Sequence, residues 1–272
     1  MTKECAVSLA FVVPIAPRRV FSNEKQWQRN IHLLQRTIAS VLQQESRNWR
    51  LIIVSEENLG VAPMERVEYI VADVPQTAGS QLEDWDMGLS NRYDENYASA
   101  MFNKAFKLMI GCRRGKELNV DYLMCLDSDD LVHKSLVSYV ENEEKCSGWR
   151  IEKGYIWRDG SAFIEKCEQL HNVNGSTHIV SAHLVDIPSF DSRKLSDYSL
   201  FESHGYLAKR LKIEKSAELS AVPFRAILVV KHQQNRSNNL YAVRFPLLKY
   251  VGKILLRGRL FTKSRRSMFM AH

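Results

Sequence analysis

The residues best suited to chemistry are a run of acids, Asp127-Ser128-Asp129-Asp130, which directly follows the apolar segment 120–126. Carboxylates at the end of a buried strand repel one another and are costly to desolvate. A divalent cation that bridged them to a diphosphate would relieve this repulsion, since Mg²⁺ and Mn²⁺ prefer carboxylate and phosphate oxygens. Acids are also favourable at a helix N-terminus, and Asp130 suits that second interpretation. We therefore predict a metal and diphosphate site at Asp127 and Asp129.

Two lysines precede this run on a predicted helix. Lys104 and Lys107 lie three residues apart, with Asn103 beside them. Lysines at this place could approach a diphosphate as point charges. They could equally form a solvated helix face opposite the apolar residues of the same segment. The spacing leaves both interpretations open.

The elements that must position these residues alternate between strands and helices. Short apolar, β-branched runs predict buried strands, and apolar residues at helical spacing predict the helices between them. The predicted order is strand, helix, strand, strand, helix, strand, over residues 7–15, 24–44, 50–55, 67–71, 97–110 and 120–126. This order predicts an α/β fold with a doubly wound, mostly parallel sheet.

The second half of the chain is less regular. An Asp-Gly turn at Asp159-Gly160 predicts a hairpin between residues 154–157 and 162–164. Further predicted elements are a glycine-centred loop at 172–177, a strand after it, a helix at 197–211 and a last strand at 226–230. We find no internal repeat and no low-complexity linker, so we expect one compact domain followed by a tail.

Composition narrows the class of protein. The 272 residues are 45% hydrophobic and 25% charged, values that exclude a disordered, collagen-like or coiled-coil chain. No apolar run reaches the ~18 residues that a membrane span needs. The N-terminal apolar stretch is interpreted as a first strand, not a signal peptide. Five scattered cysteines without metal-type spacing argue against a disulfide framework and a zinc site, and favour a reducing compartment.

The positive charge is concentrated at the C-terminus. The chain carries +7, and the segment from Lys249 onward holds seven Lys/Arg and no acid, so the first 248 residues are formally neutral (7 − 7 = 0). A nucleic-acid-binding body is disfavoured, because its charge should lie across a folded face. Residues 247–261 alternate apolar and basic groups, which predicts a basic amphipathic helix. Such a helix could lie on an anionic membrane or pack its apolar side on the domain.

Four segments together resemble one known family. They are residues 7–15 (VSLAFVVPI), 37–44 (TIASVLQQ), 51–56 (LIIVSE) and 121–131 (DYLMCLDSDDL). The chain resembles a family 2 glycosyltransferase with the GT-A fold. The resemblance implies a Rossmann-like nucleotide-binding half over about 1–131, an acceptor half over about 132–245 and a tail over 246–272. It also implies a UDP- or GDP-linked sugar donor, a divalent metal (Mn²⁺ or Mg²⁺) on its diphosphate, and a saccharide, lipid-linked or surface-polymer acceptor. A cytoplasmic enzyme of the hexosyltransferase type, peripheral at the membrane if its tail binds lipid, fits these features.

The resemblance also implies roles for individual residues in donor binding. Glu56 stands where the family usually has an aspartate that contacts the base or ribose, and this departure bears on which base is bound. The positions matched to nucleoside, diphosphate, metal or donor sugar are Pro14, Ile15, Ala16, Glu56, Asp127, Ser128, Asp129, Gly175, Ser176 and His232. The loop with Gly175 could instead be a plain turn, and His232 an ordinary surface or core histidine.

An inverting transfer needs a base that takes the proton of the acceptor hydroxyl. Glu202 falls where the family has a Glu-Asp pair, but here Ser203 and His204 follow it and the second acid is absent. The candidate bases are therefore Glu202, His204 and Asp197. Asp197 could instead be the N-cap of its predicted helix.

Two other functions compete with this interpretation. A strand followed by Asp-x-Asp also resembles the nucleophile motif of haloacid-dehalogenase-like phosphatases, with Asp127 as nucleophile. That motif normally ends the first strand, whereas about 120 residues precede it here, and Asp130 stands where Thr or Val is expected. A non-enzymatic membrane-surface module would explain the basic tail but would leave the acidic run unexplained.

Overall fold

The computed structural model describes residues 7–61, 64–77, 81–83, 95–198, 206–232 and 258–270. Its centre is a seven-stranded sheet in the order β10-β6-β9-β4-β1-β2-β3. The strands are β1 (Leu9–Pro14), β2 (Trp49–Ser55), β3 (Val67–Val71), β4 (Tyr122–Cys125), β6 (Gly148–Arg150), β9 (His178–Ser181) and β10 (Ser220–Ala221). Strand β1 pairs parallel with both β2 and β4, and β2 pairs parallel with β3, whereas β9 runs antiparallel to β4. The predicted α/β fold with a mostly parallel mixed sheet is confirmed.

A second, five-stranded sheet follows the order β12-β8-β7-β11-β5. Its strands are β5 (Leu131–Val132), β7 (Gly154–Arg158), β8 (Phe163–Cys167), β11 (Ile227–Lys231) and β12 (Gly258–Leu260). Strands β7 and β8 form the predicted antiparallel hairpin, and β11 pairs parallel with β7. Because β5 begins directly after Asp130, the run of acids lies between β4 of the first sheet and β5 of the second.

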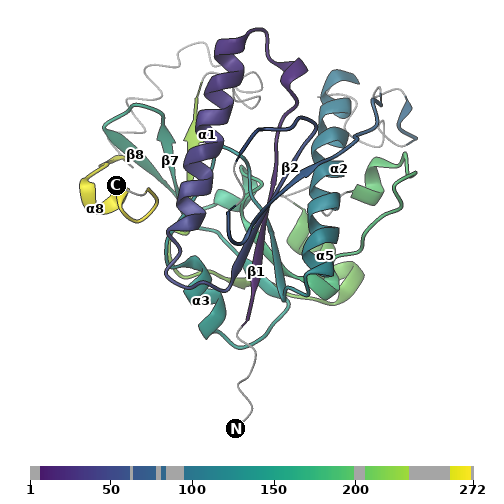
Figure 1. Cartoon of the computed structure of the whole chain (residues 1–272). Coiled ribbons are helices and arrows are strands. Elements are labelled where there is room, and N and C mark those ends of the chain that lie inside the picture. The colour runs from purple at the N-terminus through teal and green to yellow at the C-terminus, as the bar shows by residue number, and fades with distance from the viewer. Residues whose placement is uncertain are drawn as a thin grey trace.

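Two long helices cover opposite faces of the central sheet (Figure 1). They are α1 (Glu24–Leu42) and α2 (Glu95–Glu117), and the shorter helices are α3 (Leu136–Asn142), α5 (Leu207–Lys215) and α8 (Lys263–Arg266). Alternate side chains of β1 point to opposite faces, as in any strand. Phe11 and Val13 pack in the cluster that includes α1, whereas Val12 packs in the cluster that includes α2. Both faces of β1 are therefore buried, which explains its continuous apolar sequence.

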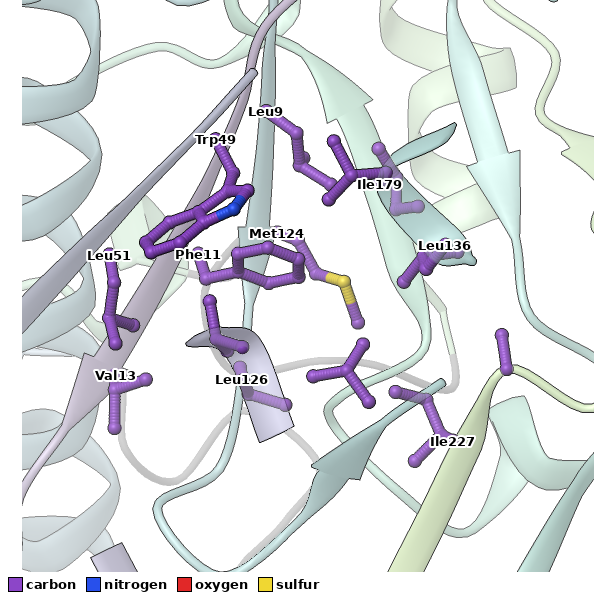
Figure 2. Packing of buried hydrophobic residues seen from close by; sticks show 14 of the residues in the cluster. Leu9, Phe11, Val13, Trp49, Leu51, Met124, Leu126, Leu136, Ile179 and Ile227 are labelled. Atoms are coloured by element: carbon purple, nitrogen blue, oxygen red, sulfur yellow. The ribbon is translucent and has the colours of Figure 1, made fainter. Parts of the chain in front are cut away.

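The cluster on the α1 side forms one continuous core. Figure 2 shows Phe11 and Val13 beside Leu51 and Met124, with Ile227 of the second sheet in the same cluster. All five side chains are fully buried. Burying such a side chain contributes about 1.5–3 kcal/mol each. The shared core fixes the second sheet against the first.

Helix α2 approaches the sheet unusually closely at Gly111. A Cβ atom on Gly111 would lie 2.2 Å from Cγ1 of Val12, and one on Gly115 would lie 2.5 Å from Cδ2 of Leu123. Only glycine allows this approach without movement of the Val12 and Leu123 side chains. The contact fixes the position of α2, and with it the position of Asn103, Lys104 and Lys107.

Two predicted helices differ from the structure. Within the range 197–211, the structure has a short 3₁₀ helix (Leu195–Tyr198) and the start of α5, while residues 199–205 lie outside the described ranges. Most of the predicted helix at 247–261 also lies outside them, but its last residues, Gly258–Leu260, form β12 on the edge of β8. Phe261 and Phe269 are buried beside this sheet, so the end of the tail packs on the domain. Within the described ranges, each helix is too short or too polar to cross a bilayer.

Candidate functional site

The candidate site lies where the parallel strands of the central sheet end. Ile15, Glu56 and Asp127 follow β1, β2 and β4, and the parallel register brings the carboxyl ends of these strands to one edge. Ligands of open α/β sheets bind beyond this edge. Residues that are 41 to 112 positions apart in the chain are thereby placed in one neighbourhood.

Asp127 is the centre of the first contact group. Its Oδ1 atom forms an ion pair with Lys104 Nζ at 2.6 Å. Both side chains are partly exposed, Asp127 at 27% and Lys104 at 39%. The backbone N–H of Asp127 donates to Ser176 Oγ at 2.8 Å. A Cβ atom on Gly175 would lie 3.5 Å from Asp127 Oδ2 and 3.6 Å from Lys104 Nζ. The structure therefore brings together four predicted residues: Lys104, Asp127, Gly175 and Ser176.

Asp129 belongs to a separate contact. His232, which follows β11, lies with Nε2 2.9 Å from Asp129 Oδ2. The histidine side chain is 7% exposed and the aspartate side chain 20%. The predicted proximity of His232 to the acidic run is therefore found, through Asp129.

Asp130 fastens the glycine-bearing loop to the end of β4. The side chain is buried, and its Oδ2 accepts hydrogen bonds from Asn174 Nδ2 and Ser176 Oγ, each at 2.7 Å. Burial, and then the charges of Asp129 and Asp127, raise the pKa of Asp130 well above its usual value. The interpretation of Asp130 as a helix start is wrong, because β5 follows it.

Glu56 lies in a dense group of donors after β2. Its Oε1 accepts from Asn103 Nδ2 at 2.8 Å and from Lys107 Nζ at 2.8 Å. The Arg19 guanidinium donates to both carboxylate oxygens. Burial alone would raise the pKa of Glu56, but the hydrogen bonds from Arg19, Lys107 and Asn103 outweigh it and lower the pKa to about 2. Glu56 is therefore an ionised acceptor at neutral pH.

Lys107 differs from both interpretations of its sequence position. Its side chain is fully buried, so it is neither part of a solvated face nor exposed to a diphosphate. It donates to the carbonyl oxygen of Ile15 at 2.7 Å and to Asn103 Oδ1 at 2.8 Å, besides its ion pair with Glu56. Burial lowers the pKa of Lys107, and Glu56 opposes that effect.

The described residues do not assemble a metal site from the protein alone. No three Asp, Glu, His or Cys side chains within the described ranges gather as a set that could hold a metal ion. The Asp127 carboxylate is paired with Lys104, and Asp129 with His232, so each acid already has a basic neighbour. The residues present do not fit the metal that the family resemblance implies, and metal binding stays a prediction.

The other predicted residues fall in three groups. Pro14 ends β1, the carbonyl oxygen of Ile15 accepts from Lys107 Nζ, and Ala16 is the next residue. The carbonyl oxygen of Ser128 accepts from Thr37 Oγ1 at 2.9 Å. Asp197 lies in a 3₁₀ helix and accepts from Ser192 Oγ. Glu202 and His204 lie outside the described residues. The candidate catalytic bases therefore stay predictions.

Comparisons with known proteins give a likeness of fold only. No protein-family model matches the chain, and no curated protein matches it. Residues 1–349 of S. aureus TarS match with a TM-score of 0.46 and 9% identity, over 82% of this chain and 60% of that chain. The same fragment in complex with UDP gives a TM-score of 0.42, 11% identity and coverage of 83% and 61%. An inositol-1-phosphate CTP transferase from T. maritima matches with a TM-score of 0.38 and 12% identity, over 87% of this chain and 95% of that chain. The chain thus spans about three fifths of the TarS fragment.

The Glu56 carboxylate should carry part of the acid sensitivity of the fold. Its pKa in the folded protein is about 2, below the usual value of 4.5. A lowered pKa contributes stability that is complete above the unfolded-state value and is lost as the pH falls through the folded-state value. We expect Glu56→Gln to melt at a lower temperature at pH 7, because Lys107 loses its counter-charge, and to show a flatter decline between about pH 4.5 and 2. Melting curves of both proteins across this range test this, and parallel declines would contradict it.

Proposed function

We propose that the protein is a glycosyltransferase that moves a sugar from a nucleotide-sugar donor to a saccharide, lipid-linked or surface-polymer acceptor. The observation that carries the proposal is the meeting of Asp127, Lys104 and Gly175 at the carboxyl edge of a mostly parallel sheet. The donor would lie across this edge. Its nucleoside end would lie near Ile15 and Glu56, and its diphosphate near Lys104.

Sugar transfer requires stabilisation of the leaving group, and Lys104 is suited to provide it. When the bond from the anomeric carbon to the phosphate oxygen breaks, negative charge builds up on the departing nucleoside diphosphate. A fixed ammonium group close to that oxygen stabilises the charge as it develops. Lys104 is 39% exposed and is held by Asp127, so it is both accessible and oriented. A side chain at position 175 would start in van der Waals contact with both members of this ion pair, and the glycine leaves that place unfilled.

A divalent metal on the diphosphate remains part of the family prediction. A bound Mn²⁺ or Mg²⁺ would supply Lewis-acid stabilisation of the leaving group. The described residues give it no three-ligand site, so the present proposal assigns the stabilisation to Lys104 and no step to a metal.

Donor binding should depend on the Lys104 ammonium through the diphosphate. We expect Lys104→Met to bind UDP and GDP about tenfold or more weakly, since a hydrogen bond to a charged group contributes about 1.5–3 kcal/mol. Binding of uridine and guanosine, which lack phosphate, should not change. Isothermal titration of UDP and GDP, first in the presence of EDTA and then in the presence of Mn²⁺, measures these affinities. The comparison of the two conditions measures the metal requirement.

The matched control for Lys104 is Lys134→Met. Lys134 pairs with Glu45 at 2.9 Å and is 42% exposed, so it resembles the Lys104 pair but lies away from the candidate site. It should leave nucleotide binding unchanged. If no nucleoside diphosphate raises the melting temperature or gives a titration signal for the wild type, the proposed function is wrong.

We also propose that the reaction is inverting and that Glu202 is its base. Glu202→Gln should lose most of its turnover while it keeps donor affinity, because a base acts in the chemical step and not in nucleotide binding. Turnover with each donor sugar, measured for Glu202→Gln, His204→Ala and Asp197→Asn, tests the three candidates. A fully active Glu202→Gln together with an inactive His204→Ala would move the role to His204.

We also propose that the enzyme works at the cytoplasmic face of an anionic membrane, with its basic tail as the contact. Arg259 and Lys263 are exposed, and Leu260 between them is 57% exposed. Phe261 and Phe269 are buried and anchor this segment to the domain. Anionic headgroups attract each Lys or Arg near the surface by about 1 kcal/mol.

Removal of the two tail charges should weaken vesicle binding. We expect Arg259→Gln/Lys263→Gln to bind phosphatidylserine-containing vesicles roughly tenfold or more weakly, from about 1 kcal/mol per charge. The control Lys209→Gln/Lys212→Gln makes the same change of charge on α5. Co-sedimentation at low salt measures both variants, and equal loss by the two, or no binding by the wild type, would reject the membrane contact.

A further inference from the structure

The most unusual group in the described structure is the buried ammonium of Lys107. Its side chain is fully buried, yet it lies between 2.7 and 2.8 Å from three acceptors: the carbonyl oxygen of Ile15, Asn103 Oδ1 and Glu56 Oε1. A lysine ammonium has three N–H donors and no acceptor. The three contacts therefore use its full donor capacity.

The cost of burying this charge requires the three acceptors to stay in place. An unpaired buried ammonium is strongly unfavourable, and removing one partner of a buried pair is far more destabilising than the pair is stabilising. The acceptors come from three different places: the residue after β1, the residue after β2 and helix α2. Lys107 thus ties together the two strand ends that border the nucleoside end of the candidate donor site.

The Glu56 carboxylate transmits this constraint outward to Arg19. Glu56 is 11% exposed in its side chain, whereas Arg19 is 44% exposed and donates to both Glu56 oxygens. A planar guanidinium that pairs with a carboxylate in this two-fold manner is fixed in orientation as well as in place. A ligand at this edge therefore meets the Arg19 guanidinium, with the carboxylate behind it.

We propose that Lys107 is a positioning residue for the nucleoside part of the donor, acting through Glu56 on Arg19. The inference rests on the proposed function, since it places a nucleotide beside Ile15. A guanidinium donates hydrogen bonds and accepts none. Uracil and guanine carry a carbonyl oxygen where cytosine and adenine carry an amino group, so an oriented Arg19 favours UDP and GDP over CDP and ADP.

A double-mutant cycle in nucleotide affinity separates positioning from general stability. We expect Arg19→Met and Lys107→Met each to weaken the preferred diphosphate, UDP or GDP, about tenfold, which corresponds to one charge-assisted hydrogen bond. Because both act on the same contact, the double variant should bind about as weakly as either single variant. Both should also reduce the ratio of affinities between the preferred nucleotide and its amino counterpart, UDP over CDP or GDP over ADP.

Lys116→Met is the matched control on the same helix. Lys116 Nζ donates to the carbonyl oxygen of Val185 at 2.7 Å, so its removal also deletes a lysine–carbonyl hydrogen bond of α2. It should leave the affinities and their ratio unchanged. If Lys107→Met does not fold, Lys107→Met/Glu56→Gln removes both charges of the buried pair, and it is compared with Arg19→Met.

The outcomes distinguish this inference from the proposed function. Wild-type binding of UDP or GDP that neither Arg19→Met nor Lys107→Met changes would overturn the inference and leave the proposed function standing. Multiplicative losses in the double variant, or an unchanged selectivity ratio, would show that Lys107 acts on stability alone and would also overturn it. Absence of any nucleotide binding by the wild type would reject both.

Discussion

Charges gathered at the carboxyl edge of the sheet must be neutralised, and the arrangement of the site follows from this requirement. Parallel strands place Glu56 and Asp127 at one edge, and Asp129 and Asp130 come directly after them. Each acid meets the requirement in a different way. Asp127 pairs with Lys104, Asp129 with His232, and Glu56 with Arg19 and Lys107, whereas Asp130 is buried among Asn174 and Ser176. The partners come from the short 3₁₀ helix after β1 (Arg18–Val20), from α2, from the loop before β9 and from the residue after β11.

This requirement also explains why the two halves of the chain form one structure. In the glycine-bearing loop of the second half, Asn174 and Ser176 donate hydrogen bonds to the Asp130 carboxylate. Ser176 Oγ also accepts a hydrogen bond from the backbone N–H of Asp127. Each of these hydrogen bonds is buried or partly buried, and an unsatisfied partner would cost about 1–3 kcal/mol. The loop is therefore fixed against the end of β4, and this places the Cα of Gly175 next to Asp127 and Lys104. Folding energy and site geometry depend on the same contacts.

Much of the fold was predictable because it depends on local pattern. Apolar, β-branched runs located β1, β2 and β4, and helical spacing located α1 and α2, since each of these elements buries a face in one of the two core clusters. The tail was not predictable in the same way. Its alternation of apolar and basic groups suits a helix, but pairing of β12 with β8 and burial of Phe261 depend on a sheet edge that lies about 95 residues earlier in the chain.

The sequence pointed to the acids and to Lys104 of the candidate site, but not to the different place of Lys107. Asp127 is recognisable because it follows a buried strand, and Lys104 because it lies on the helix before that strand. The sequence does not distinguish Lys107 from Lys104, because both are lysines on one helix, and their burial is decided by rotation of α2 against the sheet. The sequence does place Gly111 one helical turn after Lys107, but only the structure shows that Gly111 faces Val12. A lysine one turn before a glycine that touches the sheet is on the buried side.

The glutamate at position 56 suits this buried lysine. The carboxylate of a glutamate lies one methylene further from the backbone than that of an aspartate. It can therefore reach the buried Lys107 and the exposed Arg19 at the same time. Glu56 does both: Oε1 accepts from Lys107 and Asn103, and Arg19 donates to both oxygens. An acid used in this way is saturated with donors and is 11% exposed in its side chain. Its hydrogen-bonding capacity is used inside the protein, so under the proposed function a ligand at this edge would contact the Arg19 guanidinium and not the carboxylate.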